Sequence, residues 1–189
     1  MPLVANSPSD TATKATLDSP DPAARRLAVA DCADAALLLA QLRVEADMTV
    51  RHAILSRLGG LGGPGVAQAL GALLAADDAR LRGDAILALR RLGEAALPAI
   101  DAALAAADAD LRIFACNVLE GLPGAESRLR LRQVLAAEAE VNVCMAAVEA
   151  LAQQGAPEDA AALRALPARL SAEPFIAFAV GLALDEIGA

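Results

Sequence analysis

The chain has 189 residues, of which 57% are hydrophobic and only 2% aromatic, with no Trp and no Tyr. Its formal net charge is −8 and Lys14 is its single lysine, which excludes proteins that wrap nucleic acid, because phosphate binding needs a surplus of Lys and Arg. Most apolar residues are Ala and Leu, which favour packed helices over sheets, so the sequence predicts an all-α protein.

The mean hydropathy of +0.46 raises the question of a membrane protein. No apolar run reaches the roughly 18 residues that a membrane span needs, so we expect no membrane partner. Residues 1–8 lack the basic start and apolar stretch of a secretory signal, and the expected location is the cytoplasm. We expect residues 1–9 to form a loose, polar tail and residues 10–189 to form a single repeat domain.

A motif of the form acid-x-x-aliphatic-Arg recurs along the chain and opens a series of apolar helices. Its copies begin at Asp21, Asp47, Asp78, Asp108, Glu140 and Glu173, the last two with other residues in place of Arg. If the aliphatic residue is position one, the series is Ala24, Val50, Leu81, Leu111, Val143 and Ile176. The spacing of roughly 26 to 33 residues is typical of helix-pair repeats.

Positions one, five, eight, nine and twelve of these helices share one side and predict a stripe that faces the core. Glycine follows the helix at Gly62, Gly93, Gly155 and Gly188, where we expect left-handed C-terminal caps. Apolar segments between these helices predict a second set, over residues 37–42, 66–74, 96–104, 129–135 and 161–170. Such pairs bury both faces only when stacked, so we predict a right-handed α-α superhelix of about five to six helix pairs.

This pattern resembles the HEAT-like repeats of the bilin-lyase (PBS lyase) type over about residues 10 to 188. The residues that carry the resemblance are Asp47, Val50, Arg51, Leu58 and Gly62, then Asp78, Leu81, Arg82, Ala85, Ala88, Leu89, Leu92 and Gly93, then Asp108, Leu111, Arg112, Ala115 and Leu119. The resemblance implies an interaction scaffold, and it implies Asp–Arg ladders that link successive repeats through Arg51, Arg82 and Arg112.

We interpret the repeated polar residues as structural. Asp47, Asp78 and Asp108 stand where a side chain caps a helix N-terminus. At position two, Arg gives way to Cys144 and then to Ala177, so the ladder is expected to stop and the last repeats to pack differently. Asp31 and Cys32 also depart from the pattern, which indicates an N-terminal cap whose outer side meets water.

No constellation for catalysis, a metal or another cofactor emerges. The single histidine, His52, has no nearby nucleophile or second ligand and is expected to be a solvated surface residue. The His–Glu pairs of iron-dependent HEAT-repeat hydroxylases are absent. The glycine-rich residues 59–65 lack the strand and the Lys of a phosphate loop, so they predict a turn between repeats. The three cysteines are expected to be buried and unpaired.

The remaining candidate functional residues are expected to bind a partner on the protein surface. Positions three, seven and ten are expected to line a concave face, with apolar members gathering towards the C-terminal half. The predicted partner-binding residues are His52, Leu87, Arg90, Ile113, Phe114, Asn117, Met145, Glu149, Phe178 and Leu182. The alternative, that Phe114, Phe175 and Phe178 pack in the core, is favoured slightly, because the chain has only these three aromatic residues to fill it.

The leading function is therefore a non-enzymatic adaptor that is a monomer or a subunit of a hetero-complex. Its concave face would bind a helix or extended segment of another protein, in bacterial sensory or chemotaxis-type signalling. Two alternatives stay open. One is a bilin lyase or chaperone-like subunit, for which Cys116 and Cys144 are the only candidate thiols; the other is an obligate subunit of a larger assembly.

Overall fold

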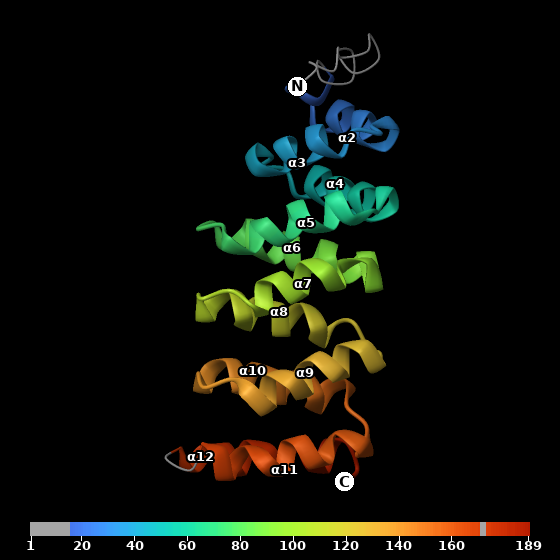
Figure 1. The fold of residues 1–189 in the computed structure, drawn as a ribbon. Coiled ribbons are helices and arrows are strands. Elements are labelled where there is room, and N and C mark those ends of the chain that lie inside the picture. Colours follow the sequence, from blue (N-terminus) through green and yellow to red (C-terminus); the bar gives the residue numbers. More distant parts are fainter. Residues whose placement is uncertain (1–15, 171–172) are drawn as a thin grey trace. The chain divides into compact units, whose positions relative to one another are not determined.

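The computed structural model describes residues 16–170 and 173–189 as a succession of helices without a strand (Figure 1). The chain divides into two compact units, Met1–Ala95 and Ala96–Ala189. The all-α fold class predicted from composition is confirmed. The helices alternate between two sets along the chain, as in helical-repeat solenoids.

The first unit contains two layers of helices. Their bounds are α2 (Pro22–Asp31), α3 (Ala35–Val44), α4 (Met48–Leu61), α5 (Pro64–Ala72), the short 3₁₀ helix η1 (Leu73–Ala75) and α6 (Ala79–Leu92), followed by η2 (Gly93–Ala96). Helix α4 packs between α2 and α6, whereas α3 and α5 cover the other side (Figure 1).

The second unit repeats this arrangement. It contains α7 (Leu97–Leu104), α8 (Ala109–Glu120), α9 (Ala125–Ala137), α10 (Val141–Gln154), η3 (Pro157–Asp159), α11 (Ala160–Arg169) and α12 (Pro174–Glu186). Helix α10 packs against α8 and α12, and α9 packs against α11. The described residues thus form α2 and five packed helix pairs, α3/α4, α5/α6, α7/α8, α9/α10 and α11/α12, in agreement with the predicted five to six.

The predicted apolar stripe faces the core within each unit. Position five is buried in all six repeats, at Ala28, Ile54, Ala85, Ala115, Ala147 and Val180. Position one is buried in four of them, and Ala24 and Leu111 are half-buried. The period of the sequence therefore placed the core correctly.

The glycine-rich residues 59–65 form a shorter turn than predicted. Helix α4 continues through Gly59 and Gly60 to Leu61, and α5 begins at Pro64. Only Gly62 and Gly63 connect the two helices, with φ angles of 63° and 87° that favour glycine. A buried side of α4 continues to its last turn, which keeps the helix intact despite the glycines.

The expectation of a left-handed cap at Gly155 was wrong. Gly155 has φ −66° and ψ 170°, so it is extended rather than left-handed. It is glycine for want of space, because a Cβ would collide with the carbonyl oxygen of Leu151 and lie 2.9 Å from Cγ2 of Ile187. Cys32, which departs from the repeat pattern, is 2% exposed and belongs to the core, as expected of the cysteines.

Candidate partner-binding surfaces

The position-two arginines hold the loop that precedes their own helix. Each donates to the backbone carbonyl six residues earlier in the chain. These bonds join Arg25 to Ser19, Arg51 to Glu45, Arg82 to Ala76 and Arg112 to Ala106, at 2.8, 2.7, 2.7 and 2.9 Å. A guanidinium with five N–H donors suits this role, since it can bind carbonyls and a carboxylate together.

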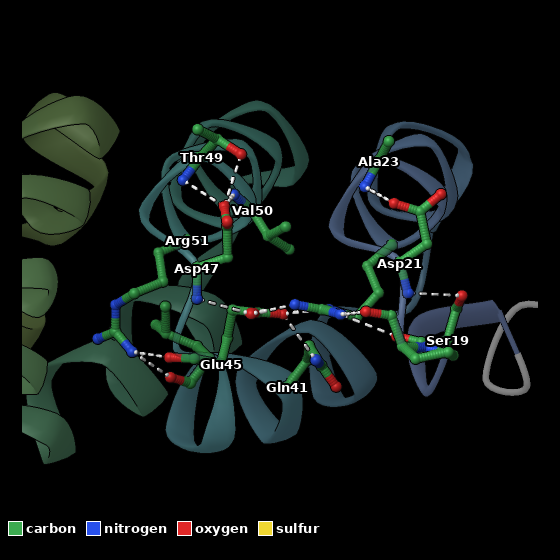
Figure 2. A network of polar contacts seen from close by, with 12 residues as sticks. Ser19, Asp21, Ala23, Gln41, Glu45, Asp47, Thr49, Val50 and Arg51 are labelled. Carbon is green, nitrogen blue, oxygen red and sulfur yellow. Dashed lines mark hydrogen bonds and ion pairs between the residues drawn. The ribbon is translucent and has the colours of Figure 1, made fainter.

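Glu45 receives the first of these arginines and is almost fully buried (Figure 2). Both its carboxylate oxygens accept bonds of 2.7 Å from Arg25, and they also accept from the Asp47 backbone N–H and the Gln41 amide, at 2.9 and 3.0 Å. These donors, led by Arg25, lower the pKa of the Glu45 carboxyl to about 2. Glu45 thereby ties α2 to the loop between α3 and α4.

Glu138 repeats this arrangement in the second unit. It stands two residues before Glu140, as Glu45 stands two residues before Asp47. Its carboxylate accepts from Arg112 at 2.6 Å and from the backbone N–H groups of Ala139 and Glu140 at 2.8 and 2.9 Å. In these two copies of the repeat, an acid two residues before the helix cap thus pairs with the arginine of the preceding repeat, a contact that the repeat motif alone does not predict.

Asp84 takes this role where that acid is missing. The residue two before Asp78 is Ala76, and Arg51 instead pairs with Asp84 inside α6. Arg51 and Asp84 are 2% and 6% exposed. Among the described contacts, the acids that pair with position-two arginines are Glu45, Asp84 and Glu138. The Arg51–Asp84 pair is an Asp–Arg contact between successive repeats, as the resemblance implies, whereas Arg112 pairs with a glutamate.

The cap aspartates instead serve their own helices. Asp47 accepts from the backbone N–H groups of Thr49 and Val50 at 2.8 and 3.1 Å, and Asp78 and Asp108 accept from Arg80 and Asp110 at 2.8 and 2.9 Å. These bonds satisfy N–H groups that have no partner inside the helix. Glu140 and Glu173 occupy the same position but make no side-chain cap bond.

A different arginine compensates for the missing ladder residue at Cys144. The Cys144 thiol donates to the Glu138 carbonyl at 3.4 Å, and Arg169 donates to the same carbonyl and, at 3.3 Å, to the Cys144 sulfur. Arg169 is the last residue of α11, so the guanidinium comes from the following helix. The last repeats thus replace a contact within one repeat with a contact from the next helix.

All three cysteines are free and buried, as predicted. Burial raises the pKa of the Cys116 thiol to about 12, and it also raises the pKa of Cys144 despite the nearby Arg169. Because the thiolate is the reactive form, these thiols are poorly suited to nucleophilic attack.

The ten predicted partner-binding residues all retain some exposure. His52, Leu87, Glu149, Phe178 and Leu182 are exposed, and Arg90, Ile113, Phe114, Asn117 and Met145 are half-buried. His52, Leu87 and Arg90 belong to the first unit and the other seven belong to the second. Within the second unit, α8, α10 and α12 carry these residues on packed neighbouring helices.

Helix α12 has the largest exposed apolar surface in this set. Phe175, Phe178 and Leu182 are 47%, 70% and 53% exposed, while Ile176, Val180, Ala183 and Ile187 are buried against the unit. The interpretation that Phe175 and Phe178 fill the core was therefore wrong, and Phe114 is half-buried. The core of this unit is filled by Leu, Ile, Val and Ala, which leaves the aromatic rings of α12 on the solvent side.

Two grooves of similar size lie between neighbouring helices. One, of about 400 Å³, is bordered by Asp101, Arg130, Val134 and Glu138, between α7 and α9. The other, of about 390 Å³, is bordered by Arg26, Ser56, Arg57 and Gly60, between α2 and α4. Within the described ranges, no three His, Cys, Asp or Glu side chains come together to hold a metal ion. No helix there combines the length and apolar character needed to cross a membrane.

Comparison with known proteins gives no family assignment. No family model and no curated protein matches the sequence. Among solved structures, human deoxyhypusine hydroxylase in complex with glycerol matches with 20% identity and a TM-score of 0.49, covering 97% of this chain and 86% of that one. An engineered protein matches with 18% identity and a TM-score of 0.43, covering 94% of this chain and 95% of that one. A second engineered protein matches with 16% identity and a TM-score of 0.42, covering 96% of this chain and 99% of that one. Because all three TM-scores are below 0.5, the assignment of the fold class is based on the helix pairs observed in this chain.

Proposed function

We propose that this chain is a non-enzymatic adaptor that binds a helix or extended segment of a partner protein through the exposed face of α12. The observation that supports the proposal is the apolar stripe formed by Phe175, Phe178 and Leu182, one helical turn or two apart on a single face. Large exposed apolar side chains that cluster on one face are typical of protein-binding sites, and aromatic residues often dominate their binding energy.

The neighbouring helices extend this surface within the second unit. Met145 and Glu149 occupy positions three and seven of α10, and Phe178 and Leu182 occupy the same positions of α12. Helices α10 and α12 pack together, and three of these four residues are apolar; Glu149, Phe178 and Leu182 are exposed and Met145 is half-buried. The resemblance to bilin-lyase-type repeats, known mainly as interaction scaffolds, supports the same function.

The test is affinity purification from the native host with the tagged chain and a Phe178→Ser, Leu182→Ser variant. We expect one protein to be recovered with the unmodified chain and lost with this variant, and the purified pair to bind again in isolation. Leu27→Ser, Val44→Ser is the matched control, since Leu27 and Val44 are 69% and 76% exposed in the first unit. Equal recovery with both variants would contradict the use of α12.

The same stripe also supports a second candidate, an obligate subunit of a larger assembly. In that case the isolated chain would associate with itself through α12 when its partner is absent. Sedimentation velocity distinguishes the two functions: the adaptor is a monomer at all concentrations, whereas the orphaned subunit forms oligomers that Phe178→Ser, Leu182→Ser disperses.

A further inference from the structure

The groove between α2 and α4 differs from the rest of the surface in its charge. The chain as a whole carries −8, yet the charged side chains that border this groove are both arginines, Arg26 and Arg57. The remaining borders are small or short side chains, including Ser56 and Gly60. A groove with low walls and two cationic groups can admit a polypeptide chain and pair with its carboxylates.

Arg57 is placed here by a departure from the repeat. It occupies position eight of α4, where the corresponding helices α6, α8, α10 and α12 have Ala88, Val118, Ala150 and Ala183. The Arg57 Nε donates to the carbonyl oxygen of Cys32 at 2.7 Å, just beyond the C-terminal end of α2. This bond orients the guanidinium, and its two terminal nitrogens have no partner among the residues that the structure describes.

Arg26 and Arg91 extend the cationic row to the helices on either side. Arg26 is exposed on α2 and makes no ion pair within the described part of the chain. Arg91, also exposed, packs from α6 across Gly59, where an added Cβ would lie 3.4 Å from the Arg91 Cβ. Arg91 therefore lies on α6 beside Gly59, the chain neighbour of the groove residue Gly60.

The charged side chains of the groove between α7 and α9, unlike those of the α2–α4 groove, are already paired. Its Arg130 already bonds to Asp101 at 2.6 Å and to Glu126 at 2.9 Å, and its Glu138 is paired with Arg112. Those charges are neutralised inside the unit, so that groove has no preference for a charged ligand. Within the ranges that the structure describes, Arg26 and Arg57 of the α2–α4 groove form no ion pair with an acid.

We infer that the α2–α4 groove binds an acidic polypeptide segment, with Arg26 and Arg57 pairing with its carboxylates and Arg91 extending the contact. Arginine is suited to this because its planar guanidinium binds a carboxylate through two parallel hydrogen bonds. A nucleic acid is the less favoured ligand, because the net charge of −8 repels an extended phosphate backbone. The inference deepens the proposed adaptor function by giving the chain a second contact with a protein.

The experiment is fluorescence anisotropy of a labelled peptide of alternating Glu and Ala, titrated with the full chain at low salt. We expect saturable binding that weakens as salt is added. Charge reversal by Arg26→Glu should weaken it about tenfold, since it replaces attraction with repulsion. Arg91→Glu should weaken it less, and a peptide of alternating Gln and Ala should not bind.

Arg164→Glu is the matched control, because Arg164 is exposed on α11 in the second unit and carries the same charge. Unchanged binding with this variant supports the groove, whereas equal weakening by Arg164→Glu and Arg26→Glu overturns it in favour of a general charge effect. Absence of peptide binding, or stronger binding of a single-stranded oligonucleotide, also overturns it. The synthetic peptide requires no native partner, so failure here is distinguishable from failure of the α12 proposal.

Discussion

Arg51 and Asp84 form a buried ion pair in which each residue depends on the other. The Arg51 guanidinium also donates to two backbone carbonyls, those of Leu42 and Glu45, at 3.0 and 2.7 Å. We predict that Asp84→Ala lowers the free energy of unfolding by about 3–5 kcal/mol, because it leaves a buried cation without its counter-charge. Urea denaturation measures the change.

The control for this prediction is Glu158→Ala. Glu158 pairs with Arg128 at 3.0 Å, but its side chain is 63% exposed, so its loss should cost less than about 1 kcal/mol. Similar losses for the two variants would show that the Arg51–Asp84 pair adds no more than a surface pair.

Glu45 makes stability depend on pH in a predictable direction. Its pKa is about 2 in the folded state, below the ordinary value of 4.5, so folding favours the ionised carboxylate. This contribution is fully present above pH 4.5 and is lost as the pH falls towards 2. We predict that the gap in urea midpoint between the unmodified chain and Glu45→Gln narrows over this window. A gap that stays constant would contradict the role of the ionised carboxylate.

The helices that open with the acidic motif differ in whether the acid makes a side-chain cap bond. Asp78 makes side-chain bonds to the backbone N–H groups of Arg80 and Leu81, at 2.8 and 3.4 Å, whereas Glu140 makes none. We predict that Asp78→Ala destabilises the protein by about 1 kcal/mol and that Glu140→Ala changes its stability by less than about 0.5 kcal/mol. Thermal and urea unfolding of the two variants, side by side, measures the difference. An equal cost would mean that charge near the helix end, rather than the cap bond, stabilises these helices.

At the scale of the whole molecule, each unit has a core of its own. In the second unit the fully buried residues include Ile100, Leu119, Leu131, Leu151 and Leu163. We predict that a fragment of residues 96–189 folds into a helical, cooperatively unfolding protein, because a unit with its own core can fold alone. Circular dichroism with urea titration is the measurement, and Leu119→Ala in the fragment is the control that should abolish cooperative unfolding.

This experiment also tests the single domain predicted for residues 10–189. In a repeat protein, each repeat is stabilised by its neighbours, so a domain with one cooperative core would lose its structure when half its repeats are removed. A fragment that shows little helix or no cooperative transition would favour the single domain over two separately stable units.

The sequence by itself determined the helices, their order and their buried side. A periodic apolar stripe and an acidic cap recur at the right spacing, and both depend on local backbone geometry that neighbouring residues specify. It also placed Asp47, Asp78 and Asp108 at helix starts and predicted the burial of the cysteines.

The tertiary structure decided which polar groups meet and which apolar groups stay exposed. Glu45, Asp84 and Arg169 reach their partners across turns or from other helices, so distances along the chain carry little information about these contacts. Phe175 and Phe178 look like core residues by composition alone. They are exposed because the opposite side of α12, which carries Ile176, Val180 and Ala183, is the side that packs against α10 and α11.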